Sequence, residues 1–123
     1  MAYVTDRKRV TGLGSARTGT AQHWTMTLTS VALLVLTPFF LYIVGSALGS
    51  DHGDVIATLS RPIPALVVAA YLLVGSHHLR LGMQVLIEDY TRGLTRKIAI
   101  IATTIVSYAI ALGGLVALIQ IAL

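Results

Sequence analysis

Five ionisable side chains lie close together in the second half of the chain: His77, His78, Arg80, Asp89 and Tyr90. An imidazole ligates a metal through its unprotonated nitrogen or passes on a proton, and a guanidinium is a permanent cation that binds anions. A carboxyl group beside a phenol exchanges protons and donates a hydrogen bond. The surrounding sequence decides which of these chemistries is available.

That surrounding sequence belongs in a lipid bilayer. Of its 123 residues, 55% are hydrophobic and only 11% charged, which excludes a soluble globular domain of this size. Three apolar runs, at about 24–49, 63–88 and 98–123, are each long enough to cross a hydrocarbon core of ~30 Å. We therefore predict an all-α membrane protein with three transmembrane helices (24–123), preceded by a polar, basic arm (1–23).

The basic residues flank the apolar runs and indicate orientation in a membrane rather than binding to nucleic acid. Four lie in the arm (Arg7, Lys8, Arg9 and Arg17), three lie between the second and third runs, and only Arg61 lies between the first two. The positive-inside rule then predicts a cytoplasmic N-terminus and a periplasmic C-terminus. A cleavable signal peptide is not expected, because the polar arm precedes a first run too long for one.

The paired histidines fall near the middle of the second run. His78 lies 15 residues after Ile63 and 12 before Tyr90, which is about 22 Å and 18 Å along a helix. An ionisable group at this depth is costly and indicates a functional site.

The two histidines differ in their neighbours on the helix. His78 shares its face with Gly75 and Gly82, whereas His77 has leucines at the same kind of spacing. A flat macrocycle approaches a helix backbone only where side chains are missing, so we expect His78 to be an axial ligand of haem iron. His77 is then expected to hydrogen-bond a neighbouring helix or the haem edge. Two alternatives stay open: the glycines form a helix-packing seam with His78 as hydrogen-bonding glue, or the histidine relays protons.

Arg80 needs an anion at the same depth. The nearest acidic residues of its helix, Glu88 and Asp89, are about 12 Å away or more. A haem propionate or an acidic group of a partner chain would pair with the guanidinium; the alternative is that its side chain snorkels to the interface.

Asp89 and Tyr90 are expected at the membrane rim, where a carboxylate beside a phenol suits a reaction that takes up protons, such as quinone reduction. A phenol there can donate a hydrogen bond to a quinone carbonyl. The alternative is an ordinary end of a membrane span, with Tyr90 as an aromatic anchor.

The remaining polar and helix-breaking residues have structural interpretations. The hydroxyls of Thr27, Thr29 and Ser30 are expected to bond back to carbonyls of their own helix, the alternative being a polar pocket. Pro38 is expected to kink the first span, and residues 50–62 to form a loop.

The stretch His78 to Tyr90 (HLRLGMQVLIEDY) resembles the second span of the smaller membrane-anchor subunit of succinate dehydrogenase, respiratory complex II. Residues 12–24 (GLGSARTGTAQHW) are similar to the N-terminal entry of the alphaproteobacterial subunits. Length, span number and orientation agree with this family over nearly the whole chain.

The resemblance implies an anchor in the bacterial inner membrane that is not an enzyme on its own. Its partners would be a second anchor of the cytochrome b556 type, an iron–sulfur subunit and a flavoprotein subunit. One haem b would lie between the anchors, with His78 as this chain's ligand, and Asp89 and Tyr90 would lie at the ubiquinone site. An anchor of a quinol:fumarate reductase and a cofactor-free structural subunit are the alternatives.

The first span departs from the family pattern. Family members usually carry an arginine that helps to hold the haem propionates where this chain has Leu28. Arg80 is then expected to hold the propionates alone or with the second anchor.

Overall fold

The computed structural model describes residues 3–14 and 18–122, and the described part contains helices and connecting segments but no strand. Arg17 and Leu123 lie outside the described residues. The helices, in chain order, are α1 (Asp6–Thr11), α2 (Gly19–Ala47), α3 (His52–Leu59), α4 (Pro62–Tyr90) and α5 (Gly93–Ala122).

Three of these helices, α2, α4 and α5, are long and apolar enough to cross a membrane. They contain 29, 29 and 30 residues, or roughly 45 Å each. The all-α class and the three transmembrane helices are confirmed. The helices exceed the apolar runs: α2 begins at Gly19 rather than Trp24, and α5 at Gly93 rather than Ile98. Backbone hydrogen bonding continues through polar residues, whereas hydropathy marks only the part that lies in lipid.

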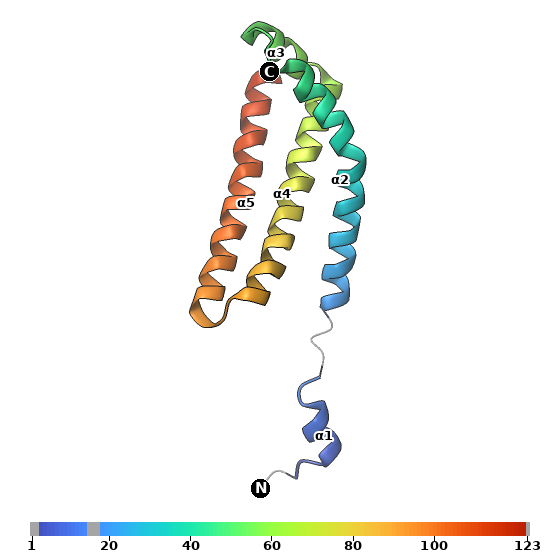
Figure 1. Cartoon of the computed structure of the whole chain (residues 1–123), viewed down its shortest axis with the longest axis vertical. Helices are drawn as coiled ribbons and strands as arrows, with labels where there is room; N and C mark the ends of the chain where they lie inside the picture. The colour runs from blue at the N-terminus through green and yellow to red at the C-terminus, as the bar shows by residue number, and fades with distance from the viewer. Residues whose placement is uncertain (1–2, 15–17, 123) are drawn as a thin grey trace.

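The helix that carries the ionisable residues, α4, lies between the other two (Figure 1). It packs against α2 on one side and α5 on the other, and over the residues described α2 and α5 do not contact each other. The short helix α3 contacts all three at the end where α5 finishes. The result is an open layer of helices, so α4 is accessible from grooves along its length.

The connections differ from the prediction in one place. Residues 50–62, expected to be a loop, contain α3, whose first turn carries Asp54 where a negative charge favours the helix dipole. Pro62 then starts α4, a position where its missing N–H costs nothing. Between α4 and α5 only Thr91 and Arg92 intervene, and Gly93 adopts a φ of 64° that lets the chain reverse.

Aromatic stacking holds the C-terminal half of α2 against α4. The rings of Phe40 and Tyr71 stack with centroids 4.0 Å apart and planes 10° apart. This contact follows Pro38, through which α2 continues as a helix that curves over its C-terminal half (Figure 1).

Small residues allow α4 and α5 to approach closely. Ser76 on α4 and Ser107 and Ala111 on α5 are buried, and the Ser107 hydroxyl donates to the carbonyl of Thr103 at 2.7 Å. In a bilayer, close backbone packing of this kind drives helix association.

This packing predicts a cost for bulk at Gly114. A Cβ atom there would lie 2.8 Å from Leu72 Cδ1, whereas one at Gly113 would meet nothing within 4 Å. We expect Gly114→Leu to lower stability by about 1–3 kcal/mol through overpacking, measured by thermal unfolding in detergent, with Gly113→Leu as the control. Equal unfolding temperatures for the two variants would contradict this packing.

Candidate functional site

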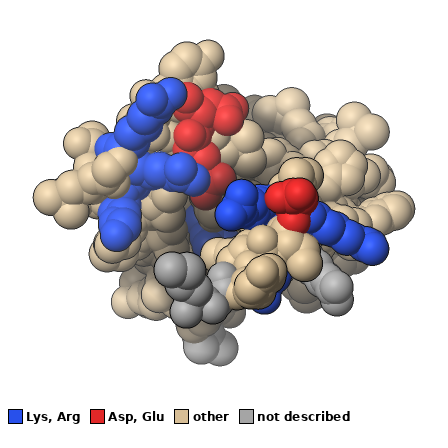
Figure 2. Space-filling model, turned by 90° about the horizontal axis from the view of Figure 1, so that it is seen from below, with Lys and Arg blue, Asp and Glu red and all other residues tan. Residues whose placement is uncertain are grey.

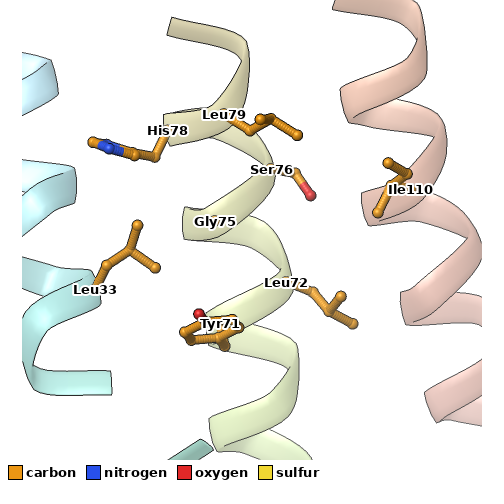
Figure 3. A pocket seen from close by; sticks show the side chains of 8 residues that line it. All are labelled: Leu33, Tyr71, Leu72, Gly75, Ser76, His78, Leu79 and Ile110. Carbon is orange, nitrogen blue, oxygen red and sulfur yellow. The ribbon is translucent and has the colours of Figure 1, made fainter. Parts of the chain in front are cut away.

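His78 projects from α4 toward α2. Its Nδ1 atom lies 2.8 Å from Oγ1 of Thr29, and the imidazole is half-buried. Leu33 on α2 points back toward Gly75 (Figure 3), where a Cβ atom would lie 3.8 Å from Leu33 Cδ2. The contact with Thr29 therefore holds the imidazole near Gly75, where α4 has no side chain.

An apolar groove of about 360 Å³ opens beside this imidazole. Its walls come mainly from α4, with one residue each from α2 and α5: Leu33, Tyr71, Leu72, Gly75, Ser76, His78, Leu79 and Ile110. Apolar walls, a glycine without a side chain and an imidazole at the rim are features that would suit one face of a flat macrocycle. The groove is open on the side away from α4. A group bound in it would therefore also be accessible to a second chain.

Gly82 does not share this arrangement. The sequence predicts that both glycines beside His78 lie open, but Met26 Cε lies 3.6 Å from the position of a Cβ atom at Gly82. Side chains of α2 thus lie at a similar distance from both glycine positions, but only Gly75 lines the groove.

His77 and Arg80 lie in a different groove, of about 420 Å³, between α2 and α4. It is more polar than the first and is lined by Thr18, Gln22, Thr25, His77, Arg80, Leu81 and Gln84. His77 Nδ1 lies 3.2 Å from the hydroxyl oxygen of Tyr108 on α5. The structure therefore does not bring His77 and Arg80 together with His78.

Arg80 has an incomplete set of partners. Its Nε atom is buried and has no hydrogen-bond partner within the described chain, and no carboxylate lines its groove. Glu88 is engaged elsewhere: it accepts a hydrogen bond from Gln84 at 3.0 Å and pairs with Arg96 at 3.5 Å. A buried guanidinium nitrogen of this kind calls for an acceptor from outside the chain.

Asp89 and Tyr90 are the last two residues of α4, and both are exposed; Tyr90 has 82% of its surface accessible. Below them, the Thr91 hydroxyl donates to the Ile87 carbonyl at 2.7 Å and fixes the helix end. Leu28 is exposed on α2 and supplies no polar group there.

Charged residues gather at the end of the molecule to which Tyr90 belongs. Figure 2 shows this end, which is the lower one in Figure 1, with lysine and arginine side chains grouped around the acidic ones. They come from α1 and from the α4–α5 connection and the start of α5, where Arg7, Lys8, Arg9, Arg92, Arg96 and Lys97 are exposed or half-buried.

The sequence does not predict the two histidine partners. Thr29 does bond back to its own helix as expected, but its contact with His78 is additional. Tyr108 is a lone tyrosine in the charge-free third run, and this isolation is the only signal that it has a polar partner.

Three helices long and apolar enough to cross a membrane, with His77, His78 and Arg80 lining grooves along the middle one, define a multi-pass membrane protein. Residues 1–117 match the family model described as succinate dehydrogenase/fumarate reductase transmembrane subunit. The chain belongs to this family.

Two curated relatives agree with this assignment. The chain is 43% identical, over its full length and 95% of the relative's, to the succinate dehydrogenase hydrophobic membrane anchor subunit of Paracoccus denitrificans. It is 35% identical over 63% of its length, and 62% of the relative's, to the protein of the same name in Rickettsia bellii. No solved structure matches it. The predicted resemblance is confirmed, as are a non-catalytic anchor subunit and a location in the bacterial inner membrane.

Proposed function

We propose that this chain anchors a succinate:ubiquinone oxidoreductase, supplies His78 as one axial ligand of haem b and contributes Tyr90 and Asp89 to the ubiquinone-reduction site. The observation that carries the proposal is the position of His78, at the rim of an apolar groove that Gly75 also lines. A second anchor of the cytochrome b556 type would close the groove and give the other ligand. The flavoprotein and iron–sulfur subunits would bind on the cytoplasmic side.

The charge distribution supports this orientation. Apart from Arg61 and Arg80, all lysine and arginine residues lie in residues 1–23 or 91–97, which by the positive-inside rule supports a cytoplasmic N-terminus and a periplasmic C-terminus. Tyr90 then lies at the cytoplasmic rim, on the side where the peripheral subunits deliver electrons.

A bound haem b would supply a one-electron redox centre. In this proposal the imidazole of His78 binds and orients it, and the apolar walls around Gly75 exclude water from its face. Arg80 supplies a permanent cation, either to a propionate directed into its own groove or to an acidic group of the second anchor. Its buried Nε atom without a partner supports such an anion, and His77 lines the same groove.

At the quinone site, the phenol of Tyr90 donates a hydrogen bond to a ubiquinone carbonyl. Reduction to ubiquinol takes up two electrons and two protons, so a donor that strengthens as charge develops on the carbonyl favours the reaction. Asp89 adjoins it and can exchange protons with the cytoplasm. The exposure of both side chains supports completion of the site by the partner subunits.

Filling the groove tests the haem site. We expect Gly75→Leu to lower the haem-to-flavin ratio of the purified complex, because a leucine side chain would occupy the space of the macrocycle. Gly75→Ala is expected to leave the ratio near normal, since its Cβ atom makes only an ordinary 3.8 Å contact with Leu33. A full haem complement with leucine would contradict a haem packed on Gly75.

A cofactor-free accessory subunit is the second candidate, and one observation favours it. The 2.8 Å contact between His78 and Thr29 joins α4 to α2, as expected for a histidine whose role is to hydrogen-bond two helices together. The visible spectrum of the purified complex separates the two candidates. A b-type band supports haem ligation, and a complex without one supports the accessory role.

A further inference from the structure

The hydroxyl group of Thr29 lies between its own helix and the imidazole of His78. Its Oγ1 atom is 2.9 Å from the carbonyl oxygen of Thr25, 3.0 Å from that of Met26 and 2.8 Å from His78 Nδ1. A hydroxyl has one proton to donate and lone pairs to accept with. At most one of these three contacts can therefore take the hydroxyl proton fully.

The neighbouring hydroxyl groups of α2 show which acceptor such a hydroxyl proton has. The hydroxyls of Thr25, Thr27 and Ser30 all donate to the carbonyl four residues earlier, at 2.8–3.0 Å. Thr29 makes the same bond at the same distance. With its proton committed to α2, its oxygen is left as an acceptor for the imidazole.

We infer that Thr29 is a positioning residue that accepts a hydrogen bond from Nδ1–H of His78 and so fixes the tautomer whose Nε2 is free to bind iron. The inference rests on the proposed role of His78 as a haem ligand. It also makes the contact that favours the second candidate compatible with haem ligation, because the interhelical hydrogen bond uses Nδ1 and leaves the other nitrogen for the metal. Since lipid offers no water as a substitute acceptor, the hydroxyl has no replacement at this depth.

Removing the hydroxyl should weaken haem binding. Outer partners of a ligating histidine fix its ring orientation and raise its basicity, and their loss typically costs about 10-fold or more in metal affinity. A less basic imidazole also stabilises ferric iron less, so the midpoint potential of the haem should rise.

The experiment compares Thr29→Val, which keeps the side-chain shape without the hydroxyl, with Thr29→Ser, which restores the hydroxyl. The control is Thr27→Val, because the Thr27 hydroxyl makes the same back-bond but is not seen to contact an imidazole. Each complex is purified, and its haem-to-flavin ratio, haem affinity and haem midpoint potential are measured. We expect about tenfold weaker haem binding and a higher potential for Thr29→Val only.

Native affinity and potential in Thr29→Val, or the same defect in Thr29→Ser, would overturn the role of Thr29. If Thr29→Val does not assemble, Thr29→Ala removes the same acceptor and is compared with Thr29→Ser in its place. The His78→Ala variant separates this failure from failure of the proposed function. If that variant loses haem while the Thr29 variants behave as wild type, only the inference is wrong; if it keeps haem, the proposed function is wrong.

Discussion

Replacing His78 by alanine is expected to abolish the b-type haem signal of the complex. The substitution removes the nitrogen at the rim of the Gly75 groove, and no other imidazole lines that groove. His77→Ala is expected to retain haem, because His77 lies in the other groove and contacts Tyr108. The measurement is the reduced-minus-oxidised optical spectrum, scaled to flavin content so that it reports haem per assembled complex.

The neighbouring histidine is a strict control for this prediction. It has the same side chain, on the adjacent residue and at nearly the same depth, and it also bonds to a neighbouring helix. A general loss of helix contacts would therefore affect both variants. Loss of haem in both would indicate an assembly defect, and retention of haem in His78→Ala would assign the imidazole to helix packing alone.

Hydropathy predicted the three spans because the cost of placing polar groups in lipid acts on whole segments. The same signal could not predict where helices begin. The polar residues from Gly19 to His23 extend α2 outside the apolar run. The eight residues of α3 were missed because so short a helix depends on its contacts with the three long helices rather than on its own sequence.

Because the predicted start of α2 is wrong, the sequence does not indicate Thr29 as the partner of His78. Thr29 lies 10 residues from Gly19 and His78 lies 12 from Tyr90, depths of about 15 Å and 18 Å from the same end. Measured from Trp24, Thr29 would lie only about 8 Å deep. With the correct helix start, the sequence would have placed the hydroxyl and the imidazole at similar depth.

Helix faces set a further limit on sequence reasoning. Spacing alone makes Gly75 and Gly82 equivalent neighbours of His78, and it does not indicate that His77 and Arg80 line a second groove. Which glycine lines a groove depends on the rotation of one helix against another. That rotation results from packing between segments far apart in the chain, which a single sequence does not report.

The second large effect is expected at the rim of the membrane. Tyr90→Phe should slow ubiquinone reduction about tenfold, the rate equivalent of ~1.4 kcal/mol, which is the size of one lost hydrogen bond to a group that gains negative charge. Succinate oxidation with an artificial acceptor should be unchanged, because the flavin and iron–sulfur subunits do not depend on this phenol. Paired assays on one preparation of the complex give both rates.

Tyr42→Phe is the matched control for this loss. Both tyrosines are strongly exposed, at 82% for Tyr90 and 78% for Tyr42, but Tyr42 lies near the opposite end of the membrane layer, toward the end of α2. A general effect of removing an exposed phenol would slow both variants, whereas a donor to the quinone carbonyl slows only Tyr90→Phe. If Tyr90→Phe loses both activities together, Tyr90 holds the peripheral subunits in place, and the hydrogen-bond donor to the quinone must come from another residue.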